Sequence, residues 1–210
     1  MRLYTYFRSS AAFRVRIALN LKRLRYEPVF VHLAKGEHRK PEYAKINPQG
    51  LLPTLELDDG TRLNQSLAII EYLEEKHPSP PLLPPDAGGR ARVRALAELI
   101  ACEIHPLNNL RVLQHLKRAL GQNEEQVNAW YRHWIADGLA KLEAELDART
   151  KFAYGDTPTM ADCCLVPQIF NAKRYNCDLA PYPITTRVFE QCMKLDAFDR
   201  AQPAKQPDAE

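Results

Sequence analysis

LYTYFRSSAAFRVRIAL, residues 3–19, decides the fold, because a short strand gives way there to a helix. The run from Leu3 to Tyr6 is typical of a strand, and the apolar spacing after the two serines is typical of a helix. Ser9 and Ser10 stand at the junction. A serine at a helix start accepts hydrogen bonds from free backbone amides, and these amides and the helix dipole favour an anion. The stretch therefore predicts an anion site, and a thiolate is one anion that would suit it.

The first 75 or so residues alternate between strand and helix signals, and the rest of the chain carries only helical ones. Asp59-Gly60 lies between two short apolar runs and predicts a hairpin turn. We therefore expect an α/β unit followed by an all-helical unit. The expected strands are residues 3–6, 28–33, 54–57 and 61–63, and the expected helices are residues 10–21, 42–46, 66–76, 90–120 and 124–149.

A proline-rich stretch separates the two parts. HPSPPLLPP, residues 77–85, holds five prolines and is followed by Gly88-Gly89, so it predicts a linker over residues 77–89. In the helical part, Thr159 and Asp162 have the spacing of a capping box, which predicts a structural helix start. Residues 201–210 contain two prolines and few apolar residues, and we expect this tail to be loose at least at its end.

Composition excludes several classes of function. The chain has 210 residues, 45% of them hydrophobic, without a membrane-length apolar run or a signal peptide, so we expect a cytoplasmic protein with no membrane partner. The five cysteines form no C-x-x-C pair and the six histidines no metal-binding motif, which favours free thiols and no metal. The net charge is only +3, and no nucleic-acid motif accompanies the basic residues. Most of the early basic residues are expected on a solvated helix face: Arg14, Arg16, Lys22, Arg23 and Arg25. Arg8 is different, because it directly precedes the two serines.

Three motifs carry a resemblance to a known family. SSAAFRVRIAL (residues 9–19), QGLLPTL (49–55) and QSLAIIEYL (65–73) resemble zeta-class glutathione transferases, a family that includes glutathione-dependent cis–trans isomerases. The resemblance covers nearly the whole chain. It implies a thioredoxin-like glutathione-binding domain over residues 1–76, a linker over 77–89 and a helical domain over 90–210 that binds substrate and forms a homodimer.

The resemblance also implies how the serines act. Ser9 would donate its hydroxyl hydrogen to the glutathione sulfur, with Ser10, Arg8 and the helix N-terminus as the rest of the catalytic group. A free thiol with a pKa near 8.5 is only a few per cent ionised at neutral pH, so such a site would activate it electrostatically. Many zeta-class members have cysteine where this chain has Ala11. We therefore expect glutathione, and not a protein cysteine, to be the nucleophile.

The remaining site residues are also implied by the resemblance. Leu52-Pro53 is similar to the cis-proline turn of thioredoxin-like folds, where a cis bond presents the Leu52 backbone to an extended peptide. Ser66 is expected to be a helix N-cap that, with Gln65, holds the γ-glutamyl carboxylate. The glutathione-binding residues are expected to be Ser9, His38, Gln49, Leu52, Pro53, Gln65, Ser66, His105 and Asn108. Arg8, Arg111 and Arg174 are expected to bind the carboxylates of a small dianionic diketo acid.

Several functions remain open. The chain looks most similar to the bacterial maleylpyruvate isomerases of gentisate breakdown, which predicts conversion of maleylpyruvate to fumarylpyruvate. Maleylacetoacetate shares the reacting portion of that substrate and is an alternative. General glutathione conjugation or dehalogenation is a second alternative and would consume glutathione. A non-catalytic interaction module is a third, although Ser9, Gln65 and Ser66 are all present.

Overall fold

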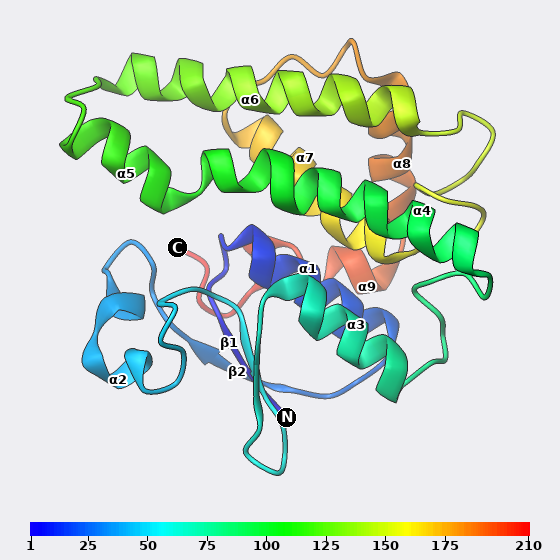
Figure 1. The fold of residues 1–210 in the computed structure, drawn as a ribbon, viewed down its shortest axis with the longest axis horizontal. Coiled ribbons are helices and arrows are strands. Elements are labelled where there is room, and N and C mark those ends of the chain that lie inside the picture. The colour runs from blue at the N-terminus through cyan, green and yellow to red at the C-terminus, as the bar shows by residue number, and fades with distance from the viewer. The chain divides into compact units, whose positions relative to one another are not determined.

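The structure is a computed structural model that describes all of residues 1–210, and the chain forms two compact units (Figure 1). One unit contains residues 1–82 and 193–210, and the other contains residues 83–192. The expected class, an α/β unit and an all-helical unit, is confirmed. Each unit is described in turn.

A four-stranded sheet organises the first unit. Its strands are β1 (Arg2–Thr5), β2 (Glu27–Phe30), β3 (Thr54–Glu56) and β4 (Arg62–Asn64), in the order β2-β1-β3-β4. β1 is parallel to β2 and antiparallel to β3, and β3 is antiparallel to β4. Leu3 of β1 lies opposite Pro28 on one side and Leu55 on the other. Because successive side chains of a strand alternate between faces, Leu3 and Tyr4 pack in two different hydrophobic cores on opposite faces of the sheet.

Helices α1 (Ser10–Leu21) and α3 (Ser66–Lys76) pack against each other, and α2 (Pro41–Ala44) follows the short 3-10 helix η1 (Glu37–Arg39). Tyr4 contacts Tyr43 of α2, with ring centroids 6.0 Å apart. This contact belongs to a second hydrophobic cluster, which also contains Tyr6, Phe7, Val31 and Leu52. Arg2–Thr5 and Ser10–Leu21 thus take nearly the expected ranges, whereas β2 ends at Phe30 and is shorter than expected.

The expectation of a solvated basic face on α1 is wrong for three residues. Arg14, Arg16 and Lys22 are buried, with 2%, 0% and 5% of their surface exposed. Arg14 and Arg16 are two positions apart and therefore project about 200° apart around the helix, so no single solvent face can hold both. Only Arg8, Arg23 and Arg25 of the early basic residues are exposed.

The loose tail expected at residues 201–210 is not found, and residues 193–210 form an ordered segment of the first unit. They contain α9 (Asp196–Asp199) and the 3-10 helix η4 (Pro203–Lys205), and α9 packs on α1, as the red and blue ribbons of Figure 1 show. Asn20 of α1 donates to the Ala197 carbonyl (3.0 Å). The first unit therefore includes this segment, which differs from the expected helical domain of residues 90–210. The buried Phe198 and Ala201, with 0% and 1% exposure, supply the apolar contact that the composition of the tail did not suggest.

A buried ion pair holds the start of the proline-rich stretch. Lys22 Nζ lies 2.7 Å from Glu74 Oε2, and the two side chains are 0% and 6% exposed. The same ammonium donates to the carbonyls of His77 (2.7 Å) and Pro80 (3.0 Å), and Glu74 accepts from the Leu82 amide (2.9 Å). Residues 77–82 are thus fixed to the first unit, and the unit boundary falls at residue 82, inside the expected linker.

The second unit is helical. Its elements are α4 (Ala87–Glu98), the π-helical turn η2 (Leu99–Ile104), the 3-10 turn η3 (His105–Asn108), α5 (Leu110–Arg118), α6 (Glu124–Glu145), α7 (Met160–Arg174) and α8 (Pro183–Met193). The expected single helix over residues 90–120 is therefore wrong. Pro106 lacks an amide hydrogen, and Asn109 starts a new helix by accepting from the Arg111 amide (3.2 Å).

The expected capping box of α7 is confirmed. The Thr159 amide and hydroxyl both donate to Asp162 Oδ2, at 2.7 and 2.9 Å. The other carboxylate oxygen accepts from the Ala153 amide (2.8 Å). Burial raises the pKa of Asp162, while these hydrogen bonds oppose that rise.

Candidate functional site

Ser9 is the N-cap of α1. Its Oγ accepts from the Ala12 amide (3.2 Å), and Ser10 is the first helical residue. The Ser9 amide donates to the Tyr6 carbonyl (2.9 Å), so residues 6–9 form a tight turn between β1 and α1. Ser9 is 9% exposed. Since the amide of Ala12 occupies an acceptor position of the hydroxyl, the Ser9 hydrogen can be donated to another group.

Arg8 is exposed on this turn, and its guanidinium lies 4.8 Å from the centroid of the Phe7 ring. A cation beside the N-terminus of α1 adds to the positive potential of the helix dipole.

The Leu52–Pro53 peptide bond is cis, as the sequence predicts. The preceding carbonyl, Leu51 O, accepts from the Tyr43 hydroxyl (2.7 Å) and from Asn47 Nδ2 (2.8 Å). Both donors are buried, with 5% and 1% exposure. The loop before β3 is therefore held in one conformation by two side chains from the segment of α2.

The start of α3 differs from the expectation. Gln65, not Ser66, occupies the N-cap position, but its side chain makes no hydrogen bond to the helix amides. The φ angle of Gln65 is +68°, which is strained for a residue with a side chain. Gln65 Nε2 instead donates to Gln49 Oε1 (2.8 Å). Ser66 Oγ accepts from Arg14 Nη1 (3.2 Å). The structure thus brings together Gln49, Gln65 and Ser66, and it links the starts of α1 and α3 through Arg14.

His38 lies in η1 and is 7% exposed. Its Nδ1 is buried without a hydrogen-bond partner. Burial, and then the charge of Arg39, lower the pKa of His38 below 6.5, so the imidazole is neutral at pH 7. The orphaned ring nitrogen is a polar group that a bound ligand could satisfy.

Four of the expected residues lie in the second unit. His105 and Asn108 belong to η3, and Asn108 is buried, with Nδ2 donating to the Tyr131 carbonyl (3.4 Å) and Oδ1 unpartnered. Arg111 is exposed in the first turn of α5. Asn108 and Arg111 do not share one continuous helix, because Asn109 separates η3 from α5.

Arg174 is the last residue of α7, with its guanidinium 4.9 Å from the centroid of the Tyr175 ring. The Tyr175 ring in turn stacks on Tyr131, with centroids 3.5 Å apart. The pKa of Tyr131 is raised by burial, and the charge of Arg174 opposes that rise. This exposed guanidinium is thus held by aromatic neighbours.

Sequence reasoning missed two groups of supporting residues. Arg14 and Arg16 are buried behind the helix starts, and Tyr43 and Asn47 hold Leu51. The signal for the arginines was available, because α1 is apolar on nearly every side and leaves no polar face for them. Nothing in the sequence pattern indicates that Tyr43 donates to a carbonyl eight positions away.

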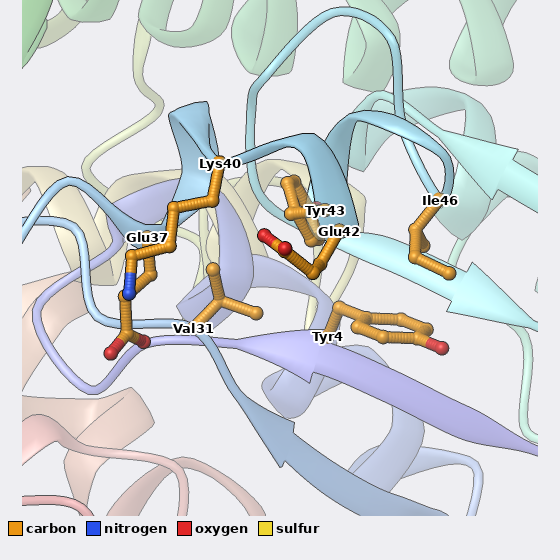
Figure 2. A pocket seen from close by; sticks show the side chains of 7 residues that line it. All are labelled: Tyr4, Val31, Glu37, Lys40, Glu42, Tyr43 and Ile46. Atoms are coloured by element: carbon orange, nitrogen blue, oxygen red, sulfur yellow. The ribbon is translucent and has the colours of Figure 1, made fainter.

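A pocket of about 370 Å³ opens beside α2, and Figure 2 shows the side chains around it. It is lined by Tyr4, Val31, Glu37, Lys40, Glu42, Tyr43 and Ile46. None of the expected site residues is among them. No three His, Cys, Asp or Glu side chains gather in a way that could hold a metal ion. None of the helices is both long and apolar enough to cross a membrane.

Comparison with known proteins identifies the family. The family model for "Glutathione S-transferase, N-terminal domain" matches residues 3–81, and the family model for "Glutathione S-transferase, C-terminal domain" matches residues 111–191. The chain belongs to the glutathione transferase family. It is 51% identical to the maleylpyruvate isomerase of a Ralstonia species over an alignment of 213 positions, which covers 100% of both chains.

Two solved structures agree with this placement. A holo maleylpyruvate isomerase, described as a bacterial zeta-class glutathione transferase, is 50% identical with a TM-score of 0.97 and full coverage of both chains. The maleylacetoacetate isomerase of Anaeromyxobacter dehalogenans, solved with dicarboxyethyl glutathione and citrate in its active site, is 47% identical with a TM-score of 0.89. That match covers 100% of this chain and 97% of the relative. The expected zeta-class resemblance is confirmed.

Proposed function

We propose that this protein is a glutathione-dependent cis–trans isomerase that converts maleylpyruvate to fumarylpyruvate in aromatic catabolism. The full-length identity of 51% to a maleylpyruvate isomerase carries the proposal. The dicarboxyethyl glutathione in the Anaeromyxobacter relative is glutathione whose sulfur carries a dicarboxylic group, the kind of adduct expected if thiolate adds to a cis-dicarboxylate.

The residues of the first unit fit glutathione. The start of α3 has no side-chain cap, so its amides are available to a carboxylate. Arg14 donates to Ser66 Oγ, which leaves the hydroxyl hydrogen of Ser66 to donate to that carboxylate. The buried Nδ1 of His38 offers a further polar contact. We assign the γ-glutamyl end to Gln65 and Ser66, the peptide backbone to Leu52 and Pro53, and further contacts to His38, Gln49, His105 and Asn108.

Bound glutathione supplies a thiolate that adds reversibly to the cis double bond, so that rotation about the resulting single bond and elimination give the trans isomer. Ser9 stabilises the sulfur anion, because its Oγ already accepts from the Ala12 amide and its hydrogen is left to donate. The N-terminus of α1 and Arg8 add positive potential. Lowering a thiol pKa by about two units would make most of it reactive at neutral pH.

Arg8, Arg111 and Arg174 bind the substrate in this proposal. The substrate is a dianion with separated carboxylates, and guanidinium groups pair with carboxylates through two parallel hydrogen bonds. All three side chains are exposed, as ligand-binding charges need to be. Negative charge that develops on the ketone oxygen during addition would be stabilised by the same positive groups.

The test is to follow fumarylpyruvate formation while titrating free thiol. One glutathione should support many turnovers, and S-methylglutathione should inhibit competitively because its sulfur cannot ionise. Loss of one thiol per product would mean conjugation instead. Activity in thiol-free protein would mean that the protein supplies the nucleophile. Parallel assays with maleylacetoacetate decide between the two isomerase substrates by their kcat/KM values.

Two further points belong to the same proposal. The family resemblance implies a homodimer, which sedimentation velocity would test.

The five cysteines form no disulfide, and this supports a reducing, cytoplasmic setting.

A further inference from the structure

Arg16 holds the turn that carries Arg8 and Ser9. The side chain is 0% exposed and lies behind the turn. Nη1 donates to Thr5 Oγ1 (3.0 Å) and to the Tyr6 carbonyl (3.3 Å), and Nη2 donates to the Phe7 carbonyl (3.1 Å). The Tyr6 carbonyl is the same acceptor that the Ser9 amide uses to close the turn. One buried guanidinium therefore fixes three successive residues before the turn ends at Ser9.

Residues 193–210 contribute the other half of this network. Arg16 Nε donates to the Ala201 carbonyl (3.0 Å), so the guanidinium joins this segment to the turn. Asp208 Oδ2 accepts from the Phe7 amide (2.9 Å). Further along, Glu210 Oε1 lies 2.8 Å from His32 Nε2, and the His32 ring contacts the ring of Tyr6. The segment thus bonds the turn directly through Asp208, and it reaches the turn indirectly through Arg16 and His32.

We propose that residues 193–210 act as a strap that sets the position of Ser9 for its reaction, with Arg16 and Asp208 as positioning residues. This inference rests on the proposed role of Ser9 toward the glutathione sulfur. Neither Arg16 nor Asp208 needs to touch glutathione or substrate. A displacement of about 1 Å at a reacting group can cost about 100-fold in rate, so fixing this turn is a function that rate measurements can detect.

Arg16 keeps its positive charge although it is buried. Burial lowers the pKa of Arg16 to about 10, and the nearby Tyr26 and Asp208 oppose that shift, so the side chain stays charged at neutral pH. The carboxylate of Asp208 is in turn a negative charge close to the turn, and by itself it would disfavour a thiolate nearby. Its presence is explained by the amide hydrogen bond that it accepts. A test must therefore separate the effect of the negative charge of Asp208 from the effect of the hydrogen bond that it accepts.

The decisive comparison is Asp208→Ala with Asp208→Asn, since both remove the charge and only asparagine keeps an acceptor for the Phe7 amide. Lys205→Ala is a control in the same segment, because Lys205 pairs with Asp199 and not with the turn. For each protein, kcat, KM for glutathione and the thiol pKa of bound glutathione are measured, the last from thiolate absorbance in the ultraviolet. Thermal unfolding is recorded in parallel.

Relative to Asp208→Asn, the Asp208→Ala variant should show a kcat lower by about 10-fold or more and a higher pKa for the bound thiol. Its KM for glutathione should change little, because the residues assigned to peptide binding lie elsewhere. Equal kcat and equal thiol pKa in the alanine and asparagine variants would overturn the strap, even if alanine lowered the unfolding temperature. A wild-type protein without isomerase activity would instead overturn the proposed function, so the two failures are distinguishable.

Discussion

Ser9 has one role in the structure and one proposed role, and an alanine would remove both together. As the N-cap of α1 its Oγ accepts from the Ala12 amide, and as the proposed thiolate donor it acts in catalysis. Replacing an N-cap serine by alanine costs about 1 kcal/mol, whereas glycine costs only a few tenths. We expect both Ser9→Ala and Ser9→Gly to lower kcat/KM by roughly 10-fold to 1,000-fold, with only the alanine variant clearly destabilised.

Steady-state kinetics and urea unfolding on the two variants separate these roles. Ser10→Ala is the control, because Ser10 is the first helical residue and not the cap. It should keep most of its activity. Full activity in Ser9→Gly would contradict the proposed donor, and so would a larger catalytic loss in Ser10→Ala than in Ser9→Ala.

His38 makes stability depend on pH in acid. Its pKa in the folded protein is below its ordinary value of 6.5, because burial disfavours the charged ring. Between the folded and unfolded pKa values the unfolded chain binds more protons, so the free energy of unfolding falls as pH drops below 6.5. We expect His38→Gln to show a smaller loss of stability over this range, measured by urea unfolding at several pH values. An unchanged acid slope would show that His38 is not the cause.

Among the elements, the ends of α1 and α3 are joined by the Lys22–Glu74 pair. Removing one partner of a buried pair costs about 3–5 kcal/mol, so Lys22→Met should destabilise the protein by about that amount. A double replacement by Met and Leu should not recover this loss, because the backbone groups of His77, Pro80 and Leu82 also lose their partners.

Urea unfolding followed by circular dichroism measures these losses. Asp147→Asn serves as the control, since the Asp147–Arg149 pair is exposed and should contribute little to stability. A double variant as stable as the wild type would show that the proline-rich stretch does not depend on this ion pair.

The elements also show how far sequence patterns reach. The strand-to-helix transition at the serines and the α7 capping box could be predicted, because both depend on neighbours within a few residues. Pro106 is a local signal for a kink between η2 and α5, but the apolar periodicity continues past it and hides the start of a new helix at Asn109. Ser66 was misassigned as a cap for a related reason: the residue before it takes a positive φ, which depends on the surrounding fold and not on side-chain type.

At the scale of the whole molecule, the first unit is discontinuous in sequence. Phe198 and Ala201 are buried in it, although they follow α8 of the other unit directly. We expect native-state hydrogen exchange in increasing urea to group their amides with those of α1. The amides of Val188 and Cys192 in α8 should instead follow α7. Exchange of residue 198 together with α8 would contradict this division.

The division into units was only partly accessible from the sequence. Composition located the proline-rich stretch, but a boundary drawn there assigned everything after it to one helical domain. The contacts that return residues 193–210 to the first unit join positions as far as 201 apart, as for Phe7 and Asp208. Local patterns carry no information on pairs so distant, and Arg16, which bonds this segment, was itself expected on a solvated helix face.

The discontinuity has a consequence for how the protein is made. A ribosome adds roughly 5–20 residues per second, so residues 83–192 take on the order of 10 s to synthesise after the sheet has emerged. Throughout this interval Arg16 lacks the Ala201 carbonyl and the Phe7 amide lacks Asp208. During this interval the first unit is incompletely folded, because the charged Arg16 lacks one of its hydrogen-bond acceptors. Chaperones that bind the first unit would act in the same interval. The turn that carries Ser9, the proposed donor to the glutathione sulfur, would reach its final position only when the last residues of the chain have been synthesised.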